Sequence, residues 1–334
     1  MNTLKVGIIG GGSWGTTVAA ITARNSPAVL WARDAHTVNE INTHHRNEKY
    51  LPGAKLPDSL RATTSVAEAV QNADVVVMGV PSQCFRSVLQ DVKPFIRPWV
   101  PIVSLTKGIE QGTMMRMTQI IENVMPGHPT GILTGPNLAR EIMAGQAAAS
   151  VIAMIDSNVA TALQGIFRSG LFRVYTNDDV IGCEIAGALK NVIAIAVGMG
   201  DGMGAGDNTR AALITRGLAE LTRLGVAMGG KYPTFAGLAG MGDLIATCTS
   251  PLSRNRHVGV QLGKGRSIDE IIKEMSMVAE GVKTSGVVLE LAKTYGVEMP
   301  ITQEVYCVVT GQKTPSEAFK GLLRVKTRAE SDPG

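Results

Sequence analysis

Short apolar runs alternate with amphipathic segments along the first half of the chain. The runs are rich in β-branched residues, as is typical of buried strands, and they cover residues 5–10, 28–31, 74–80, 100–106, 131–134 and 150–155. Helical spacing follows at residues 13–24 and 36–46, and Ser65 with Glu68 has the spacing of a capping box. Strands that alternate with helices in this way predict a parallel sheet covered on both faces.

The pattern changes at Asn177, Asp178 and Asp179. Beyond these residues, long Ala-rich segments have the period of helices, at residues 181–199, 208–224, 268–277, 284–295 and 302–310. We therefore expect a sheet-containing domain over residues 1–178 and an all-helical domain over residues 179–323. Residues 324–334 are polar and end in Pro-Gly, which predicts a loose tail.

Length and composition fit this division. A chain of 334 residues, of which 45% are hydrophobic, can bury the cores of two domains. The net charge of +4 is small and Lys and Arg form no long run, so neither nucleic acid nor a membrane surface is indicated as a partner. No apolar run reaches the length that we expect of a bilayer-spanning helix, so we expect no membrane insertion.

The four cysteines bear on metal binding and on the redox environment. They form no CxxC pair, so the sequence predicts neither a metal site nor a disulfide framework. The N-terminus carries no signal-peptide pattern. We therefore expect a protein of the reducing cytoplasm.

A glycine-rich turn follows the first predicted strand and precedes the first predicted helix. Gly10, Gly12 and Gly15 fit the pattern GxGxxG. In that motif the first glycine makes a tight turn, the second lets a pyrophosphate approach the backbone, and the third lets helix and strand pack closely. N–H groups at the helix N-terminus bind the phosphates. The sequence therefore predicts a dinucleotide cofactor at residues 10–15.

The residues after the second strand bear on which dinucleotide binds. NAD enzymes carry an acidic residue there for the ribose 2′-hydroxyl, whereas an arginine accommodates a 2′-phosphate. Here Arg33 precedes Asp34. Arg33 favours NADP while Asp34 is compatible with NAD, so we expect NAD or NADP with a preference for NADP.

Six further motifs follow the glycine loop in a fixed order. They are Ser104-Leu105-Thr106-Lys107-Gly108, Gly135-Pro136-Asn137, Gly187-Ala188-Leu189-Lys190-Asn191-Val192, NTRAALITRG at residues 208–217, Gly242-Asp243-Leu244 and Ser253-Arg254-Asn255-Arg256. With this set the chain resembles bacterial NAD(P)-dependent glycerol-3-phosphate dehydrogenases over residues 4–323. Related dehydrogenases share the glycine loop but not the other motifs.

The resemblance carries expectations for fold and activity. It implies an α/β Rossmann-type N-terminal domain followed by an all-α C-terminal domain like that of 6-phosphogluconate dehydrogenase. It implies the reversible, NAD(P)H-dependent reduction of dihydroxyacetone phosphate to sn-glycerol 3-phosphate. It also implies a cytoplasmic homodimer that supplies glycerophospholipid biosynthesis.

Reducing a ketone requires a proton for the forming alkoxide and positive groups that stabilise the developing charge. The five histidines are poorly placed for this, and the only one near a motif, His257, follows Arg256. Lys190 is the better acid, because it lies in a nearly uncharged helical stretch whose small residues leave room for a substrate. The resemblance also makes Lys190 the proton donor and acceptor. Asn191 beside it is expected to orient the substrate.

Other polar residues of the motifs are assigned to the substrate. Lys107 follows a strand, where open α/β sheets bind ligands, and we assign it to the substrate carbonyl and to the cofactor. Asp243 suits a helix N-cap, and together with that role its carboxylate could hold Lys190 or accept from substrate hydroxyls; Thr247 lies one turn on. The donors Ser253, Arg254 and Asn255 are expected to bind the phosphate, with Arg254 bidentate and also near the cofactor.

The remaining contacts come from the resemblance alone. It places Ser13, Trp14, Ala139, Val278 and Glu280 at the cofactor, and Tyr50 is a further coenzyme contact. Gly135 and Asn137 are assigned to the substrate. Many members of the family carry Ser or Thr in place of Asn137, and an amide can also donate a hydrogen bond, so that contact stays open.

Two other classes of protein share part of this pattern. A related β-hydroxyacid or 6-phosphogluconate-type dehydrogenase would have the glycine loop and a helical lysine, but not the motifs at Gly242 and Ser253. A non-catalytic nucleotide-sensing module would have no need of four residues together, namely Lys107, Lys190, Asp243 and Arg254.

Overall fold

The computed structural model describes residues 4–275 and 279–324. The described residues divide into two compact units: a sheet unit of residues 4–106 and 116–180, and a helical unit of residues 107–115, 181–275 and 279–324. Residues 107–115 were expected in the first domain, but Ile109 is buried in the core of the helical unit. The local pattern of a loop does not report such a long-range contact.

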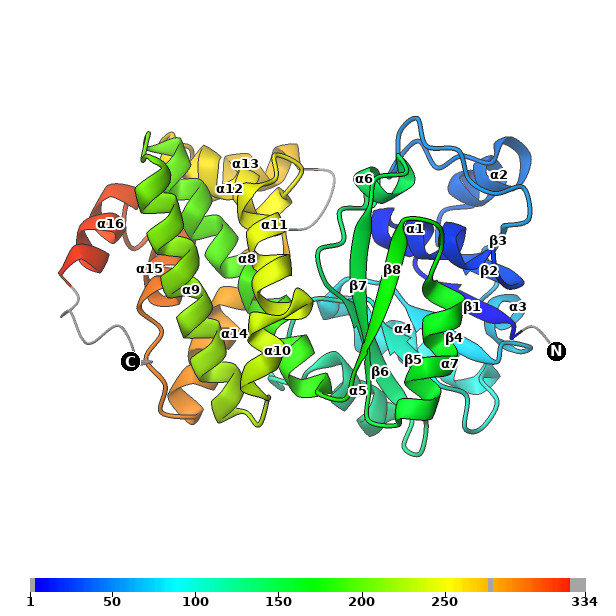
Figure 1. The fold of residues 1–334 in the computed structure, drawn as a ribbon. Helices are drawn as coiled ribbons and strands as arrows, with labels where there is room; N and C mark the ends of the chain where they lie inside the picture. The colour runs from blue at the N-terminus through cyan, green and yellow to red at the C-terminus, as the bar shows by residue number, and fades with distance from the viewer. Residues whose placement is uncertain (1–3, 276–278, 325–334) are drawn as a thin grey trace. The chain divides into compact units, whose positions relative to one another are not determined.

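An eight-stranded sheet forms the centre of the sheet unit, with the strand order β3-β2-β1-β4-β5-β6-β7-β8 (Figure 1). The strands are β1 Val6–Ile9, β2 Ala28–Trp31, β3 Arg61–Thr63, β4 Val75–Met78, β5 Ile102–Ser104, β6 Thr130–Thr134, β7 Ala148–Met154 and β8 Phe172–Asn177. The six predicted runs are strands. The sequence missed β3, which has only three residues, and β8, whose residues are largely exposed.

One strand departs from the predicted parallel arrangement. β7 runs antiparallel to β6, whereas the other neighbouring strands are parallel. The connection between β6 and β7 contains only the five-residue helix α6, Ala139–Met143. Five helical residues rise only about 7.5 Å, which does not return the chain along the sheet to start a parallel strand.

Helices cover both faces of this sheet. They are α1 Ser13–Thr22, α2 Ala35–His44, α3 Val66–Val70, α4 Phe85–Val92, α5 Met117–Val124, α6 and α7 Ser157–Phe167. Val6 and Ile8 of β1 share a buried cluster with α1 and α7, whereas Gly7 between them faces Ala69 of α3. This alternation follows from the two-residue period of a strand.

The capping box predicted at the start of α3 is present in part. The Ser65 hydroxyl accepts a hydrogen bond from the Glu68 backbone N–H. The Glu68 carboxylate instead accepts from the hydroxyl of Thr63 at the end of β3. Glu68 therefore ties the helix to the neighbouring strand.

The helical unit is built around α8, Val180–Gly202, which is buried on all sides between residues 182 and 200 (Figure 1). Its other helices are α9 Asp207–Ala227, α10 Tyr232–Ala236, α11 Asp243–Thr249, α12 Arg254–Gly263, α13 Ile268–Glu274, α14 Glu280–Thr294, α15 Pro300–Val309 and α16 Pro315–Leu323. The sequence did not predict α10, α12 or α16 as separate helices. The predicted end of α13 at residue 277, and the tail from residue 325, lie outside the described residues.

The length of α8 corrects one expectation. Its 23 residues are long and apolar enough to cross a bilayer, whereas the expectation from the sequence was that no run has this length. In the structure 94% of its most apolar stretch is buried within the protein. An all-round apolar helix is also what the centre of a helical core requires, and α8 has that role here.

Close packing of α8 and α12 brings their polar residues together. A Cβ at Gly198 of α8 would lie 2.2 Å from the Arg256 carbonyl oxygen, and one at Gly259 of α12 would lie 2.1 Å from the Ile195 oxygen. Only glycine permits this approach. The contact fixes the N-terminal end of α12 relative to α8, which carries Lys190 and Asn191.

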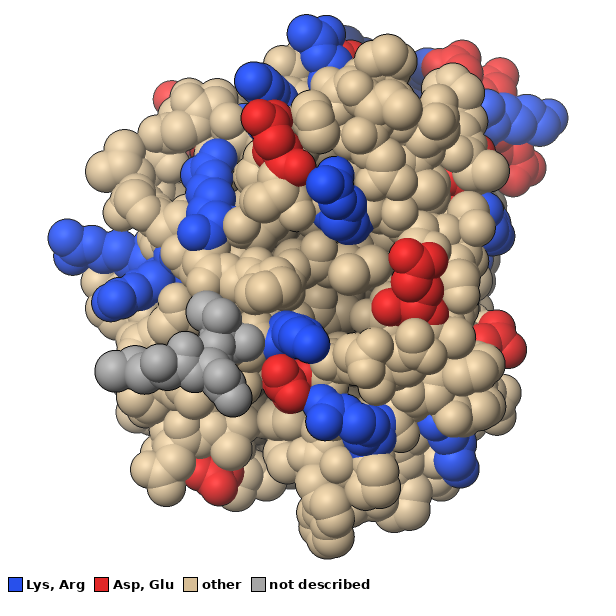
Figure 2. Space-filling view, turned by 90° about the vertical axis from the view of Figure 1, so that its right-hand side faces the viewer, with Lys and Arg blue, Asp and Glu red and all other residues tan. Residues whose placement is uncertain are grey.

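The surface charge of the described residues is mixed. On the face shown in Figure 2, basic side chains lie interspersed with acidic ones. This face therefore presents no continuous basic surface, in agreement with the small net charge of +4.

Candidate active site

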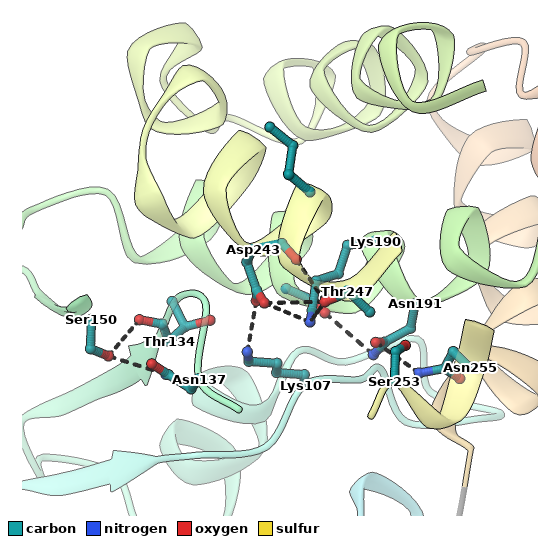
Figure 3. A network of polar contacts seen from close by, with 12 residues as sticks. Lys107, Thr134, Asn137, Ser150, Lys190, Asn191, Asp243, Thr247, Ser253 and Asn255 are labelled. Carbon is teal, nitrogen blue, oxygen red and sulfur yellow. Dashed lines mark hydrogen bonds and ion pairs between the residues drawn. The ribbon is translucent and has the colours of Figure 1, made fainter. Parts of the chain in front are cut away.

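Two lysines share one carboxylate in the helical unit (Figure 3). The Nζ of Lys190 lies 2.7 Å from Oδ1 of Asp243, and the Nζ of Lys107 lies 2.7 Å from Oδ2 of the same residue. The side chains of Lys190 and Asp243 are buried, with 7% and 2% of their surface exposed, whereas Lys107 keeps 16%. Two positive charges and one negative charge leave this cluster with a net charge of +1 when both lysines are protonated.

Thr247 completes the cluster one turn along α11 from Asp243. Its hydroxyl donates to the Asp243 carbonyl oxygen at 2.6 Å and accepts from the ammonium of Lys190. A hydroxyl has one hydrogen, so the bond to the carbonyl leaves Thr247 as an acceptor toward Lys190. Asp243 and Thr247 therefore engage two of the three N–H donors of Lys190.

The position of Asp243 excludes one of the roles that the sequence left open, that of a helix N-cap. The N-cap of α11 is Gly242, and Asp243 is the first helical residue, with no side-chain cap. Its carboxylate binds the two lysines instead. Asp243 is therefore an ion-pair partner and not the cap of its helix.

Burial changes the acidity of groups in this cluster. Desolvation lowers the pKa of Lys107 to about 8; the nearby Lys190 acts in the same direction, and Asp243 opposes both. Burial also raises the pKa of the Cys248 thiol to about 12, so this neighbour of Thr247 stays a neutral thiol. Lys107 is therefore a cation whose charge is lost in a mildly alkaline range.

A chain of amides joins α8, α12 and α14. The Asn255 amide donates to Oδ1 of Asn191 at 2.9 Å, and the Asn255 oxygen accepts from the Gly281 backbone N–H at 3.0 Å. Gly281 has no room for a side chain, because a Cβ there would lie 2.6 Å from the Asn191 carbonyl oxygen. The sequence assigned Asn191 and Asn255 separately, and it missed Gly281 because its role depends on packing.

Ser253 and Arg254 lie at the N-terminus of α12. Ser253 is the N-cap and accepts from the Arg256 N–H, while Arg254 begins the helix and is exposed. Although the residue keeps exposed surface, surrounding protein atoms partly desolvate its guanidinium and so lower the pKa of Arg254. The negative charge of Glu280 opposes that shift. A guanidinium at a helix N-terminus is a strong anion-binding arrangement. Val278, which was assigned to the cofactor, lies outside the described residues.

The glycine loop in the sheet unit has the geometry that its pattern predicted. Gly10 has φ +124°, and a Cβ there would lie 2.4 Å from the Gly79 oxygen. A Cβ at Gly15 would lie 2.0 Å from the Gly10 oxygen, whereas one at Gly12 would meet no atom within 4 Å. Gly10 and Gly15 are therefore required by packing, and Gly12 faces open space of the kind that a pyrophosphate needs.

Three other predicted cofactor residues, Ser13, Trp14 and Tyr50, lie in this loop or in contact with it. The Ser13 hydroxyl donates to the Tyr50 carbonyl oxygen at 3.0 Å, so Tyr50 contacts the loop through its backbone. The ring of Trp14 packs edge-on against Phe172, and its Nε1 is buried with no hydrogen-bond partner among the described residues. The structure therefore places Ser13 beside Tyr50, and it packs the Trp14 ring against Phe172.

Arg33 and Asp34 differ in how far they are engaged. Asp34 is the N-cap of α2, accepts from His36 N–H and the Thr37 hydroxyl, and lies 3.3 Å from Lys49. These contacts lower the pKa of Asp34. Arg33 is exposed at the end of β2. The acidic group is therefore occupied by local structure, whereas the arginine is accessible.

Asn137 lies in the loop between β6 and α6, after Gly135 with φ +130° and before Ala139, the first residue of α6. Its amide donates to the Ser150 hydroxyl, which donates to the Thr134 carbonyl oxygen (Figure 3). The sequence missed Ser150, although a lone serine in an apolar strand was a usable signal. Asn137 therefore uses one of its amide N–H groups for a hydrogen bond within the protein.

Comparison with known proteins identifies the family to which this chain belongs. Family models for the N-terminus and the C-terminus of NAD-dependent glycerol-3-phosphate dehydrogenase match residues 5–160 and 179–320. The chain is 66% identical over 99% of both chains to glycerol-3-phosphate dehydrogenase [NAD(P)+] 2 of Sphingopyxis alaskensis. It belongs to the NAD-dependent glycerol-3-phosphate dehydrogenase family. A Mycobacterium bovis relative is 61% identical over 96% of this chain and 94% of its own.

Solved structures of glycerol-3-phosphate dehydrogenases share the fold. That from Coxiella burnetii superimposes with a TM-score of 0.92 at 36% identity, covering 96% of this chain and 99% of that one. The yeast enzyme gives 0.82 at 30% identity, with coverage of 96% and 99%. A ketopantoate reductase from Ralstonia eutropha, at 16% identity and a TM-score of 0.59, shows the fold alone. The predicted family, two-part fold and enzyme class are confirmed.

Proposed function

We propose that this NAD(P)-dependent glycerol-3-phosphate dehydrogenase interconverts dihydroxyacetone phosphate and sn-glycerol 3-phosphate with Lys190 as its acid and base. The observation that carries the assignment of roles is the pairing of Lys190 and Lys107 on one buried carboxylate. Reducing a ketone places negative charge on one oxygen, and a cluster with a net positive charge suits that oxygen.

Lys190 supplies the proton in the reducing direction. Bound coenzyme provides the hydride. Asp243 and Thr247 hold two of the donors on the Lys190 Nζ, so the ammonium is fixed with a third N–H for the substrate oxygen. That N–H protonates the forming alkoxide, and in the opposite direction the neutral amine removes the proton from the alcohol.

Lys107 supplies charge at the same oxygen. Its ammonium shares Asp243 with Lys190, so each cation is only half neutralised by the carboxylate. The residual charge stabilises the developing alkoxide more than the neutral ketone, which is the difference that lowers the barrier.

The phosphate end of the substrate is assigned to the start of α12. Arg254 provides a guanidinium for bidentate binding, and the helix N-terminus adds N–H groups. Asn255 and Asn191 hold each other, so their positions are fixed before the substrate binds. Gly135 and Asn137 of the sheet unit remain assigned to the substrate.

The coenzyme is assigned to the glycine loop, with a preference for NADP. The open space at Gly12 supports a pyrophosphate there. Asp34 is engaged in capping α2, which leaves the exposed Arg33 to meet a 2′-phosphate. Arg33→Ala should raise KM for NADPH more than KM for NADH. An equal change with both coenzymes would remove Arg33 from this role.

The cofactor also remains assigned to four further residues, Ala139, Glu280, Lys107 and Arg254.

We also propose a cytoplasmic homodimer that supplies glycerophospholipid synthesis. The four cysteines are free thiols, which suits a reducing compartment. Sedimentation equilibrium measures the subunit number.

The test of the proposed activity is NAD(P)H oxidation with dihydroxyacetone phosphate, run beside unphosphorylated dihydroxyacetone. We expect turnover with the phosphorylated ketone and a much lower kcat/KM without the phosphate. Arg254→Ala should reduce that difference by raising KM for the phosphorylated ketone alone. Equal turnover of both ketones would contradict the phosphate-binding assignment.

A further inference from the structure

A buried asparagine outside all of the motifs holds the glycine loop. Asn47 follows α2 and has no exposed surface. Its side-chain amide donates to the Gly11 carbonyl oxygen at 3.0 Å and to the Thr16 hydroxyl at 2.9 Å. These acceptors lie on the two sides of Gly12, where the open space for a pyrophosphate lies.

One further hydrogen bond lies within the glycine loop, and another joins the loop to the segment of Asn47. The Thr16 hydroxyl donates to the Gly11 carbonyl oxygen at 3.2 Å, so this carbonyl accepts from both Thr16 and Asn47. The Ser13 hydroxyl donates to the carbonyl oxygen of Tyr50, three residues after Asn47. The turn at residues 47–51 therefore contacts the glycine loop and the start of α1 at Gly11, Ser13 and Thr16.

The orientation of the Asn47 amide is determined by its acceptors. A flipped amide would set its oxygen against the Gly11 carbonyl oxygen, and two acceptors repel each other. In the orientation found, Oδ1 is buried without a partner among the described residues. Retaining a buried amide with an unsatisfied oxygen is unfavourable for stability alone, which points to a role for its two N–H bonds.

We propose that Asn47 is a positioning residue for the coenzyme, which fixes the Gly11 carbonyl and so directs the N–H groups of the loop toward the pyrophosphate. This inference rests on the proposed placement of the coenzyme at the glycine loop. Asn47 acts through the backbone of residues 11–16 and does not contact the coenzyme.

The test compares Asn47→Ala with Asn42→Ala. Asn42 also makes two amide bonds in the sheet unit, but both go to the backbone of Ala62 and not to the glycine loop. Losing two hydrogen bonds at the loop should raise the Kd of both NADPH and ADP-ribose at least about tenfold in Asn47→Ala. At saturating coenzyme, kcat should stay near that of the wild type. Asn42→Ala should lower Tm and leave both Kd values unchanged.

Thr16→Val provides a second measurement if Asn47→Ala does not fold. It keeps the volume and removes the hydroxyl, so Asn47 loses one acceptor and the Kd of ADP-ribose should rise severalfold. Unchanged Kd values in whichever of these loop variants fold, beside a wild type that binds coenzyme, would overturn the positioning role. A wild type that binds neither coenzyme would instead overturn the proposed function.

Discussion

Lys190 depends on two neighbours that hold its ammonium, and its replacement separates chemistry from binding. We expect Lys190→Met to lower kcat by about 10²–10⁴, because the methionine fills the space but provides no proton. The Kd for NADPH should hardly change, since the glycine loop lies in the sheet unit. Lys264→Met, at an exposed lysine of the same unit, is the matched control. Near-normal kcat in Lys190→Met would refute the assignment.

The acidity of Lys107 predicts an alkaline limit on catalysis. Because burial lowers the pKa of Lys107 to about 8, its positive charge is lost as pH rises through that value. We expect kcat/KM for reduction of dihydroxyacetone phosphate to fall above about pH 8. Lys107→Arg should move this limb to higher pH, since a guanidinium stays protonated. The measurement is the pH profile of both proteins, and coincident alkaline limbs would exclude Lys107 as their origin.

The same shift has a consequence for stability with a defined sign. Between pH 8 and the usual lysine pKa of 10.5, the unfolded chain binds the proton that the folded chain has released. The contribution of Lys107 to the free energy of unfolding therefore becomes more favourable as pH rises across that window. Below the window, the full cost of burying the charged ammonium lowers the stability of the folded protein. Asp243 reduces this penalty because it pairs with the ammonium.

The sequence predicts residues of this cluster better than their contacts. The spacing of Asp243 and Thr247 on one helix face follows from helical geometry, and their hydrogen bond confirms it. The shared carboxylate was not predictable, because Lys107, Lys190 and Asp243 are brought together only by the folding of distant segments. Asn47 was missed for the same reason.

At the scale of elements, α9 stabilises the start of α15 through a buried carboxylate. Glu220 of α9 accepts hydrogen bonds from the backbone N–H groups of Ile301 and Thr302 and from the Thr302 hydroxyl. Burial raises the pKa of Glu220 to about 7, although these hydrogen bonds oppose the rise. Helix periodicity predicts that α9 and α15 exist, but it does not show that one caps the other.

This cap predicts how stability varies with pH. Between the usual glutamate pKa of 4.5 and about 7, the folded protein holds a proton that the unfolded chain has lost. The Glu220 contribution to the free energy of unfolding therefore falls as pH rises through that window. We expect Glu220→Gln to remove this fall. The free energy of unfolding of the variant, relative to that of the wild type, should therefore be higher at pH 8 than at pH 5 by up to about a few kcal/mol.

Urea unfolding at the two pH values measures the difference. Glu290→Gln, at an exposed glutamate of α14, is the control and should change stability equally at both. If Glu220→Gln shows the same offset at pH 5 and pH 8, the cap does not titrate in this range.

At the scale of the whole molecule, each unit has its own hydrophobic core. One core surrounds α8, and the other lies between the sheet and the helices α1 and α7. The periodicity of the sequence predicted both cores. It did not predict that residues 107–115, which lie between two segments of the sheet unit in the sequence, pack in the helical unit. That excursion places Lys107 in the unit that carries Lys190.

Separate cores predict that a ligand of one unit stabilises that unit selectively. ADP-ribose lacks both the nicotinamide and the 2′-phosphate, so its proposed contact is that of its pyrophosphate with the glycine loop of the sheet unit. At 100 times its Kd it should add about 2.7 kcal/mol to the opening free energy of the sheet unit. Hydrogen exchange should therefore slow in β1, α1 and β4 while the buried amides of α8 keep their rate. Equal slowing in α8 would mean that the two cores open as one cooperative unit, because a ligand protects only those amides whose opening requires its release.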